Sequence, residues 1–247
     1  MKKHIPNILT LLNLFCGTVA VIYAVNGQTG IAAFFVFLGI FFDFFDGFAA
    51  RKLHVQSDIG LQLDSLADMV TSGVVPGMVM YHLLQLSLDP GSWGQGIRVD
   101  LSSPQGFIPF TGLFITLASA YRLAKFNIDD DQQTSFTGLP TPANTLFILS
   151  LPLILIYQES ELAFSLIRNT WVLIILTFIS CYILNAKVKL FALKFIKNWG
   201  FRENAIKYVF LLSCIVLLVL LRFAAIPVII LSYIIVSVAT NKKTGAV

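Results

Sequence analysis

The chain has 247 residues, of which 57% are hydrophobic and only 12% are charged, and its mean hydropathy is +0.82. A soluble domain usually carries about 25% charged residues, so this composition excludes an ordinary soluble protein and predicts an integral membrane protein. The net charge of +4 does not indicate nucleic-acid binding, because basic loops that orient membrane spans explain it more simply. The apolar runs lack the polar alternation of a membrane barrel. The expected fold is therefore an all-α, polytopic bundle of membrane helices.

About eight apolar runs approach the roughly 17–25 residues that a helix needs to cross a bilayer. The last two are separated only near Arg222, so six helices plus two further ones fit the pattern equally well. No internal repeat or low-complexity linker is visible, and we expect a single membrane domain over residues 1–247. In chain order the runs cover about residues 5–25, 30–50, 60–86, 107–126, 141–157, 169–186, 206–222 and 224–240.

The basic residues predict how the spans are oriented. If the N-terminus is cytoplasmic, all of the 17 lysines and arginines except Arg98, Arg168 and Arg222 fall on the inner side. Such a bias is typical of cytoplasmic loops, so we expect a multi-pass protein of the cell membrane with a cytoplasmic N-terminus. The basic, amphipathic segment 187–204 is expected to lie along the inner surface.

Four aspartates lie at helical spacing where the second and third runs approach each other. Asp43 and Asp46 are three residues apart, and Asp64 and Asp68 are four apart, so each pair lies on one helical face. A charged side chain in a membrane costs at least about 2.5–3.5 kcal/mol, and neighbouring like charges add to that cost. We therefore expect a bound divalent cation, and all-oxygen ligands favour hard ions such as Mg²⁺, Mn²⁺ or Ca²⁺.

Other interpretations of the acidic cluster remain open at this point. A single interfacial aspartate is more often a helix cap, and Asp58 is expected at or near the start of the third helix in that role. A divalent-cation transporter also needs intramembrane carboxylates, although its site usually lies near the midplane on broken, repeated helices. A purely structural membrane scaffold leaves the buried charge unexplained.

Small residues and an arginine stand at fixed distances from the four aspartates. Written out, the stretch is Asp43-x2-Asp46-Gly47-x2-Ala50-Arg51-x8-Gly60-x3-Asp64-x3-Asp68. These positions match the signature D-x2-D-G-x2-A-R-x8-G-x3-D-x3-D, so the chain resembles the CDP-alcohol phosphotransferase family. The resemblance implies two divalent cations, Mg²⁺ or Mn²⁺, held by Asp43, Asp46, Asp64 and Asp68, with Asp68 also the general base. It implies that the CDP portion of the donor contacts Asp46, Gly47, Ala50, Arg51 and Gly60.

Further segments resemble the phosphatidylserine synthase branch of that family. They are IPNILTLLNLFCG (5–17), TSGVVPGMVMY (71–81), YRLAKFNI (121–128) and FTGLPTPA (136–143). One departure is Lys125, which stands where the branch usually has arginine. The resemblance implies that Arg122, Lys125 and Asn127 orient the carboxylate of a small acceptor. Asn7, Thr10 and Asn13 form a polar stripe on the first run, which suits hydrogen bonding between helices and ligand contact equally well.

The implied reaction joins CDP-diacylglycerol and L-serine to give phosphatidylserine and CMP. Within the same chemistry the acceptor could instead be glycerol phosphate, inositol phosphate or choline, and the donor could be an ether lipid. Because only Arg122 and Lys125 are evident near the acceptor, a singly charged acceptor such as serine is favoured. The resemblance also implies a homodimer that works in contact with membrane lipid.

Overall fold

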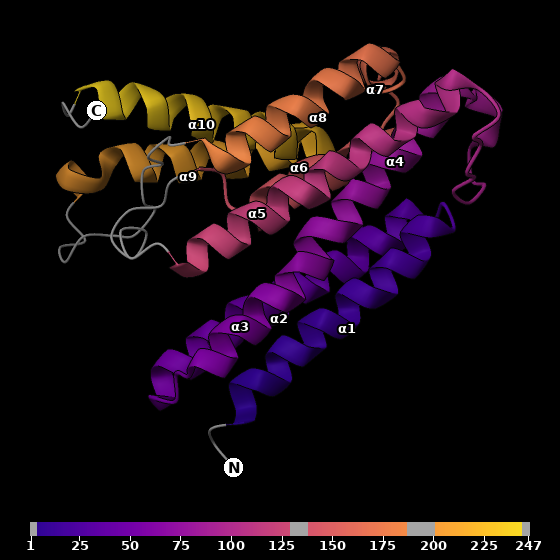
Figure 1. Cartoon of the computed structure of the whole chain (residues 1–247). Coiled ribbons are helices and arrows are strands. Elements are labelled where there is room, and N and C mark those ends of the chain that lie inside the picture. The colour runs from indigo at the N-terminus through magenta and orange to yellow at the C-terminus, as the bar shows by residue number, and fades with distance from the viewer. Residues whose placement is uncertain (1–3, 129–137, 187–200, 244–247) are drawn as a thin grey trace.

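The structure of the chain, a computed structural model, describes residues 4–128, 138–186 and 201–243. Its account of side chains covers residues 4–128, 138–186 and 208–238. Every regular element in these ranges is helical (Figure 1). The predicted all-α fold is therefore confirmed.

The first part of the chain forms one long helical hairpin and then a third long helical stretch. Pro6 occupies the first turn of the first helix, where a missing N–H costs nothing. The third stretch contains a π-helical segment directly after Asp68, and such segments are frequent at functional sites. The elements are α1 (Ile5–Val25), α2 (Thr29–Leu53), α3 (Asp58–Asp68), the π-helix η2 (Met69–Val74) and α4 (Val75–Leu88).

The second part begins after a loop that carries the short 3₁₀ segment η3 (Pro90–Ser92). A longer 3₁₀ segment, η4 (Pro104–Leu113), leads into α5 (Phe114–Ile128). Pro109 lies inside η4, where a regular α-helix would be interrupted. The remaining elements are α6 (Thr141–Tyr157), α7 (Glu161–Ile167), α8 (Thr170–Asn185), α9 (Phe201–Leu221), η6 (Arg222–Ala224) and α10 (Ala225–Lys243).

Each of the eight apolar runs coincides with a helical stretch, but the stretches differ as membrane spans. Five are long and apolar enough to cross a bilayer in the described chain when Tyr208–Val238, which covers the last two runs, is taken as one stretch. The pair α7–α8, which bends by 72°, would make a sixth. Helix α6 has 17 residues and is shorter than these. The chain is therefore a multi-pass membrane protein.

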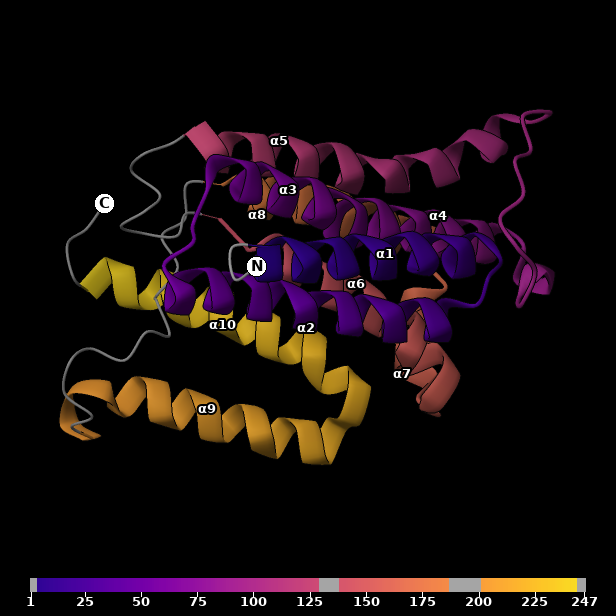
Figure 2. The ribbon, with the colours of Figure 1, turned by 90° about the horizontal axis from the view of Figure 1, so that it is seen from below.

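The chain reverses at Arg222, the position at which the sequence separates the last two apolar runs. The rings of Phe210 in α9 and Tyr233 in α10 lie 5.9 Å apart, whereas a straight helix would separate them by roughly 35 Å at 1.5 Å per residue. Arg222 itself adopts a φ of 48°, in the left-handed region that ends a helix. Helices α9 and α10 thus form a hairpin (Figure 2). The segment 187–204 lies almost wholly outside the described residues.

Helices α4 and α6 form the centre of the bundle. Both are apolar on all sides, as expected for buried helices, and most of their residues are buried. Helices α1 and α2 pack on them as a pair, and α3 packs on α1. Helices α1 and α2 therefore each present one face to the core and the other outward. The outward face of α2 carries phenylalanines such as Phe34, Phe41 and Phe44.

A close approach between α1, α2 and η2 depends on two glycines. A Cβ on Gly17 would lie 2.3 Å from Thr71 Oγ1, and a Cβ on Gly39 would lie 2.8 Å from Asn13 Oδ1. Neither distance is tolerable, so only glycine lets the three helices meet here. The approach brings the polar face of α1 against the start of η2, next to Asp68.

Candidate active site

A tight turn brings the aspartates of α2 against those of α3. His54 ends α2 with a φ of 53°, and the Ser57 side chain caps α3 by accepting a hydrogen bond from the Gly60 N–H. Ser57 is therefore the N-cap, and Asp58 is the first residue of the helix beside it. Because the turn is short, the chain reverses there, and α3 packs on α1 with Asp64 toward Asp43 and Asp46 of α2.

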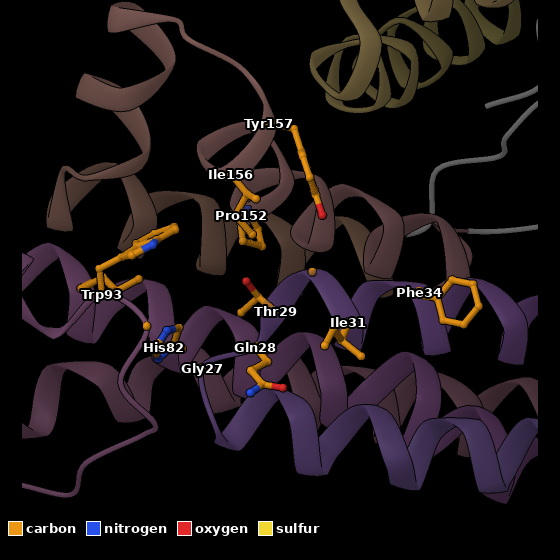
Figure 3. Close-up of a pocket in the computed structure, with 13 residues that line it drawn as sticks. Gly27, Gln28, Thr29, Ile31, Phe34, His82, Trp93, Pro152, Ile156 and Tyr157 are labelled. Carbon is orange, nitrogen blue, oxygen red and sulfur yellow. The ribbon is translucent and has the colours of Figure 1, made fainter.

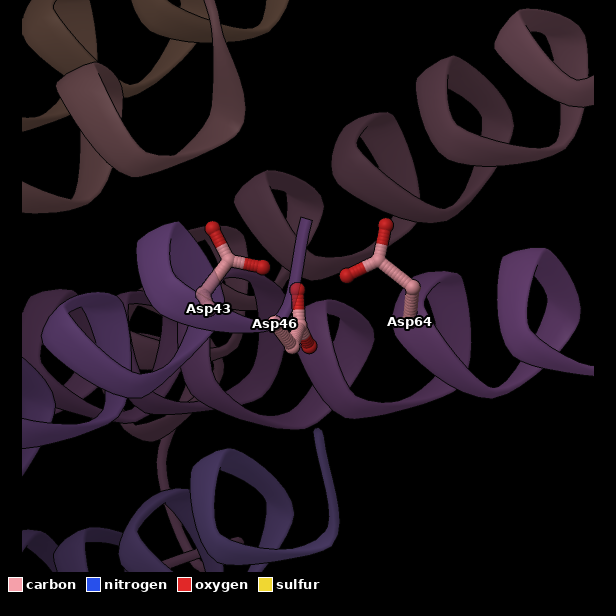
Figure 4. Close-up of side chains that lie close together, drawn as sticks. All are labelled: Asp43, Asp46 and Asp64. Atoms are coloured by element: carbon pink, nitrogen blue, oxygen red, sulfur yellow. The ribbon is translucent and has the colours of Figure 1, made fainter. Parts of the chain in front are cut away.

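Three of the four predicted metal ligands lie close enough together to bind one cation. One carboxylate oxygen from each of Asp43, Asp46 and Asp64 lies within 4.8 Å of the others. Asp43 and Asp64 face each other, with Asp46 between them (Figure 4). This arrangement lets a single cation contact all three residues.

The donor set fits a hard divalent cation. All the converging atoms are carboxylate oxygens, which Mg²⁺, Mn²⁺ and Ca²⁺ prefer. Asp64 Oδ1 is buried and accepts no hydrogen bond from a described residue. A buried carboxylate oxygen without a donor is costly, and a cation would compensate it.

Asp68 lies one helical turn beyond Asp64, outside the cluster of three. Its Oδ1 accepts a hydrogen bond from Asn13 Nδ2 (3.2 Å), and Asn13 Oδ1 accepts one from the Thr71 hydroxyl (2.8 Å). Asn13 and Thr71 are fully buried. The Asp68 carboxylate is therefore held in one orientation by a chain of hydrogen bonds that runs from η2 through α1.

The polar stripe on α1 serves the aspartates directly. The Thr10 hydroxyl donates to Asp46 Oδ2 (2.5 Å), while Asn13 contacts Asp68. Asn7 lies at the start of the stripe, where its Oδ1 would be 3.4 Å from a Cβ on Gly60. Of the two readings left open by the sequence, hydrogen bonding between helices thus holds for Thr10 and Asn13.

A cavity of about 430 Å³ opens beside the acidic cluster, between α1, α2 and the start of α3. The Arg51 side chain folds over Gly47, so that a Cβ on that glycine would lie 3.4 Å from Arg51 Nη1. Asn7, Thr10, Asp58 and Asp64 also line the cavity. All five residues predicted to contact CDP lie on its walls: Asp46, Gly47, Ala50, Arg51 and Gly60.

The three predicted acceptor residues on α5 have different surroundings. Arg122 is only 9% exposed, its Nε has no partner among the described residues, and its charge interacts with that of Asp68. The Asn127 amide instead exchanges hydrogen bonds with Ser65 Oγ (2.9 and 3.1 Å), which ties α5 to α3. Lys125 is half-buried on the same helix. Arg122 is thus the member of the trio whose charge acts on Asp68.

Two residues of the site were not expected from the sequence. Thr71 orients Asn13, and Ser65 positions Asn127. Both residues are small and uncharged, as many residues in helix contacts are. The sequence alone therefore does not distinguish them from residues that only pack between helices. The similarity of segment 71–81 to one family branch was the only indication for Thr71.

A comparison of the sequence with models of protein families identifies one family. The model of the family described as CDP-alcohol phosphatidyltransferase matches residues 3–183. The chain belongs to this family of enzymes. The match covers the acidic cluster, the cavity beside it and Arg122, and it ends within α8.

Several curated proteins resemble the chain over more than half of its length. The CDP-diacylglycerol–serine O-phosphatidyltransferase of Bacillus subtilis is 36% identical over 144 residues, which are 57% of this chain and 70% of that protein. The archaetidylserine synthase of Methanothermobacter thermautotrophicus is 30% identical over 166 residues, or 66% of this chain and 64% of that protein. A CDP-diacylglycerol–serine O-phosphatidyltransferase of Helicobacter pylori is 30% identical over 146 residues, 58% of this chain and 55% of that protein.

Proposed function

We propose that the chain transfers the phosphatidyl group of CDP-diacylglycerol to the hydroxyl of L-serine, giving phosphatidylserine and CMP. The observation that carries the proposal is the three-carboxylate cluster on the wall of a cavity that also holds Arg51 and the signature glycines. The acceptor is supported by relatives named as serine O-phosphatidyltransferases and by the buried Arg122 guanidinium, whose charge acts on Asp68.

The carboxylates of Asp43, Asp46 and Asp64, with Asp68 one turn away, would hold two divalent cations, Mg²⁺ or Mn²⁺. When bound, such ions neutralise the diphosphate and the charge that develops on the leaving CMP. Thr10 supports this site because its hydrogen bond fixes the orientation of Asp46, as partners of metal ligands usually do.

The cavity residues would bind the nucleotide half of the donor. Gly47, Ala50 and Gly60 have little or no side chain, so the diphosphate and ribose can approach the backbone closely. The Arg51 guanidinium lies over Gly47, where it can contact a phosphate through two parallel hydrogen bonds. The donor is thereby oriented with its scissile bond toward the aspartates.

Asp68 would act as the general base. The serine hydroxyl oxygen attacks the phosphorus of the lipid phosphate, its proton passes to the Asp68 carboxylate, and the bond to CMP breaks with its electron pair leaving on CMP. A well-placed base contributes typically about 10²–10⁴-fold in rate. Asn13 keeps the carboxylate in position, and Arg122, whose Nε has no partner in the described part of the chain, would bind the carboxylate of serine.

The topology belongs to the same proposal. We place the N-terminus and the acidic site on the cytoplasmic side of the cell membrane, because most lysines and arginines then lie inside. Serine and CMP could exchange with water there while both lipids stay in the bilayer. We also propose that residues 1–247 form one domain and that the protein acts as a homodimer.

The decisive experiment measures CMP release by the purified protein with CDP-diacylglycerol, Mg²⁺ or Mn²⁺, and one acceptor at a time. We expect release with L-serine, and little with glycerol phosphate, inositol phosphate or choline. A preference for another alcohol would contradict serine as acceptor while leaving the chemistry intact. Release with none of them, together with cation uptake by vesicles that contain the protein, would favour a transporter.

A further inference from the structure

A second cavity, of about 390 Å³, lies at the opposite end of α2 from the aspartates. It is bounded by the turn between α1 and α2, by α4, by the end of α6 and by the loop that carries Trp93 (Figure 3). Thr29 on its wall precedes Asp43 by roughly 20 Å along the helix, at 1.5 Å per residue. The cavity is therefore separate from the candidate active site.

A buried histidine lines this cavity and has an unsatisfied nitrogen. His82 of α4 is 2% exposed, and its Nδ1 has no hydrogen-bond partner among the described residues. Buried polar side-chain atoms nearly always have a partner. Because His82 lies on the wall of a cavity, a group bound in that cavity can supply the missing partner.

The other polar groups of the cavity are neutral. Tyr157 extends from α6 toward α2 (Figure 3), and its hydroxyl would lie 3.5 Å from a Cβ on Gly30. Trp93 and Gln28 add an indole N–H and an amide, and none of the described residues that line this cavity is charged. Tyrosine and tryptophan are typical of the headgroup level of a membrane. Such a set suits uncharged oxygens, for example the ester carbonyls of a lipid.

An adjoining cavity of about 430 Å³ adds one positive charge. The two cavities share Leu86, Trp93 and Ile156 as walls. The second is lined mainly by apolar residues together with Arg168, and the described residues on its wall include no carboxylate. An arginine guanidinium matches the geometry of a phosphate.

We propose that the two cavities together bind one glycerophospholipid. Arg168 contacts its phosphate, while His82, Trp93 and Tyr157 contact the glycerol ester region. The acyl chains leave along α2, where Phe34 and Ile31 are exposed to 62% and 44%. The occupant is a lipid because α2 and the stretch that contains α4 are long and apolar enough to span a membrane, so the medium outside this opening is the bilayer.

The test is native mass spectrometry of the full-length, delipidated protein titrated with phosphatidylglycerol. We expect one tightly retained lipid on the unmodified protein. The double variant Arg168→Gln/Tyr157→Phe should weaken this binding at least about tenfold, since it removes a charge-assisted hydrogen bond and a second donor. Both side chains are exposed, so the fold should survive, and thermal unfolding checks this.

Two control variants separate this site from general lipid adhesion and from the active site. Arg98→Gln removes the same charge from an exposed loop residue that lines neither cavity, and it should leave the retained lipid in place. Asp68→Asn should also leave it, even if Asp68 proves unimportant for CMP release. Equal loss with Arg98→Gln, or no loss with the double variant, would overturn the proposal.

A photoreactive phosphatidylglycerol gives an independent readout. With a diazirine in its acyl chain, the lipid should label peptides from the first half of α2 and the end of α6. A control variant carries Leu11→Trp and Phe15→Trp on the exposed face of α1, away from the two cavities. It should not alter this labelling. Labelling confined to other helices would show that the cavities are not where the lipid binds.

Discussion

The two ends of α2 differ in charge although both are enclosed by helices of the same bundle. At one end Asp43 and Asp46 meet Asp64 of α3, and α1 supplies hydrogen bonds to Asp46 and Asp68. At the other end no charged residue of the described chain lines the cavity around His82. The comparison shows that one helical membrane bundle can enclose both a charged site and an uncharged cavity. The candidate active site differs from the second cavity because it gathers several carboxylates, holds two of them in place by hydrogen bonds, and needs a cation to balance their charge.

The largest effect should come from the proposed base at the acidic end. Asp68→Asn keeps the shape of the side chain but cannot accept the serine proton, so CMP release should fall by about 10²–10⁴-fold. Binding of CDP-diacylglycerol should remain measurable. The matched control is Asp58→Asn, a cavity residue outside the carboxylate cluster, which should retain most activity. Full activity of the Asp68 variant would remove it as base.

A smaller loss should follow when the support of a metal ligand is removed. Thr10→Val deletes the hydroxyl that contacts Asp46, and loss of such a partner typically costs about 10–100-fold in metal affinity or activity. Titration with Mn²⁺ followed by electron paramagnetic resonance measures the affinity. Thr18→Val is the control, because its exposed hydroxyl only contacts the Leu14 carbonyl in the same helix. If both variants bind Mn²⁺ like the unmodified protein, Thr10 does not support a metal ligand.

Serine recognition should depend on the buried guanidinium of α5. Arg122→Gln should raise the KM for serine at least about tenfold, as expected when a hydrogen-bonded charge pair is lost. The KM for CDP-diacylglycerol should change less. Lys125→Gln removes the same charge one turn along and should have the smaller effect. An unchanged serine dependence in the Arg122 variant would show that the acceptor binds elsewhere.

The smallest effect on turnover, and one seen mainly in stability, should come from helix packing. Gly17→Ala places a Cβ 2.3 Å from Thr71 Oγ1, and overpacking of this kind costs typically about 1–3 kcal/mol. Gly30→Ala at the far end meets its nearest side-chain atom only at 3.5 Å and should be tolerated. Thermal unfolding in detergent compares the two. Equal melting temperatures would mean that α1 and η2 can separate without cost.

Much of the acidic end could be read from the sequence because its information is local. Spacings of three and four residues place Asp43 with Asp46 and Asp64 with Asp68, and the short segment between α2 and α3 makes the two pairs neighbours. The packing of α1 was different. Thr10 and Asn13 could be seen as a stripe, but their partners on α2 and α3 lie far away in the chain. Spacing along one helix cannot specify which neighbour it faces.

The sequence alone determined that this protein is an all-helical membrane protein with four aspartates poised for a divalent cation, because apolarity and helical spacing are sums over nearby residues. Only the tertiary structure decided that Asn13 and Thr71 orient Asp68, that Asn127 is bound to Ser65, and that His82 meets Trp93 and Tyr157 around a cavity. Those pairings join segments that are remote in the chain. They depend on how closely helices approach, which is set by the glycines and side-chain volumes of several helices at once.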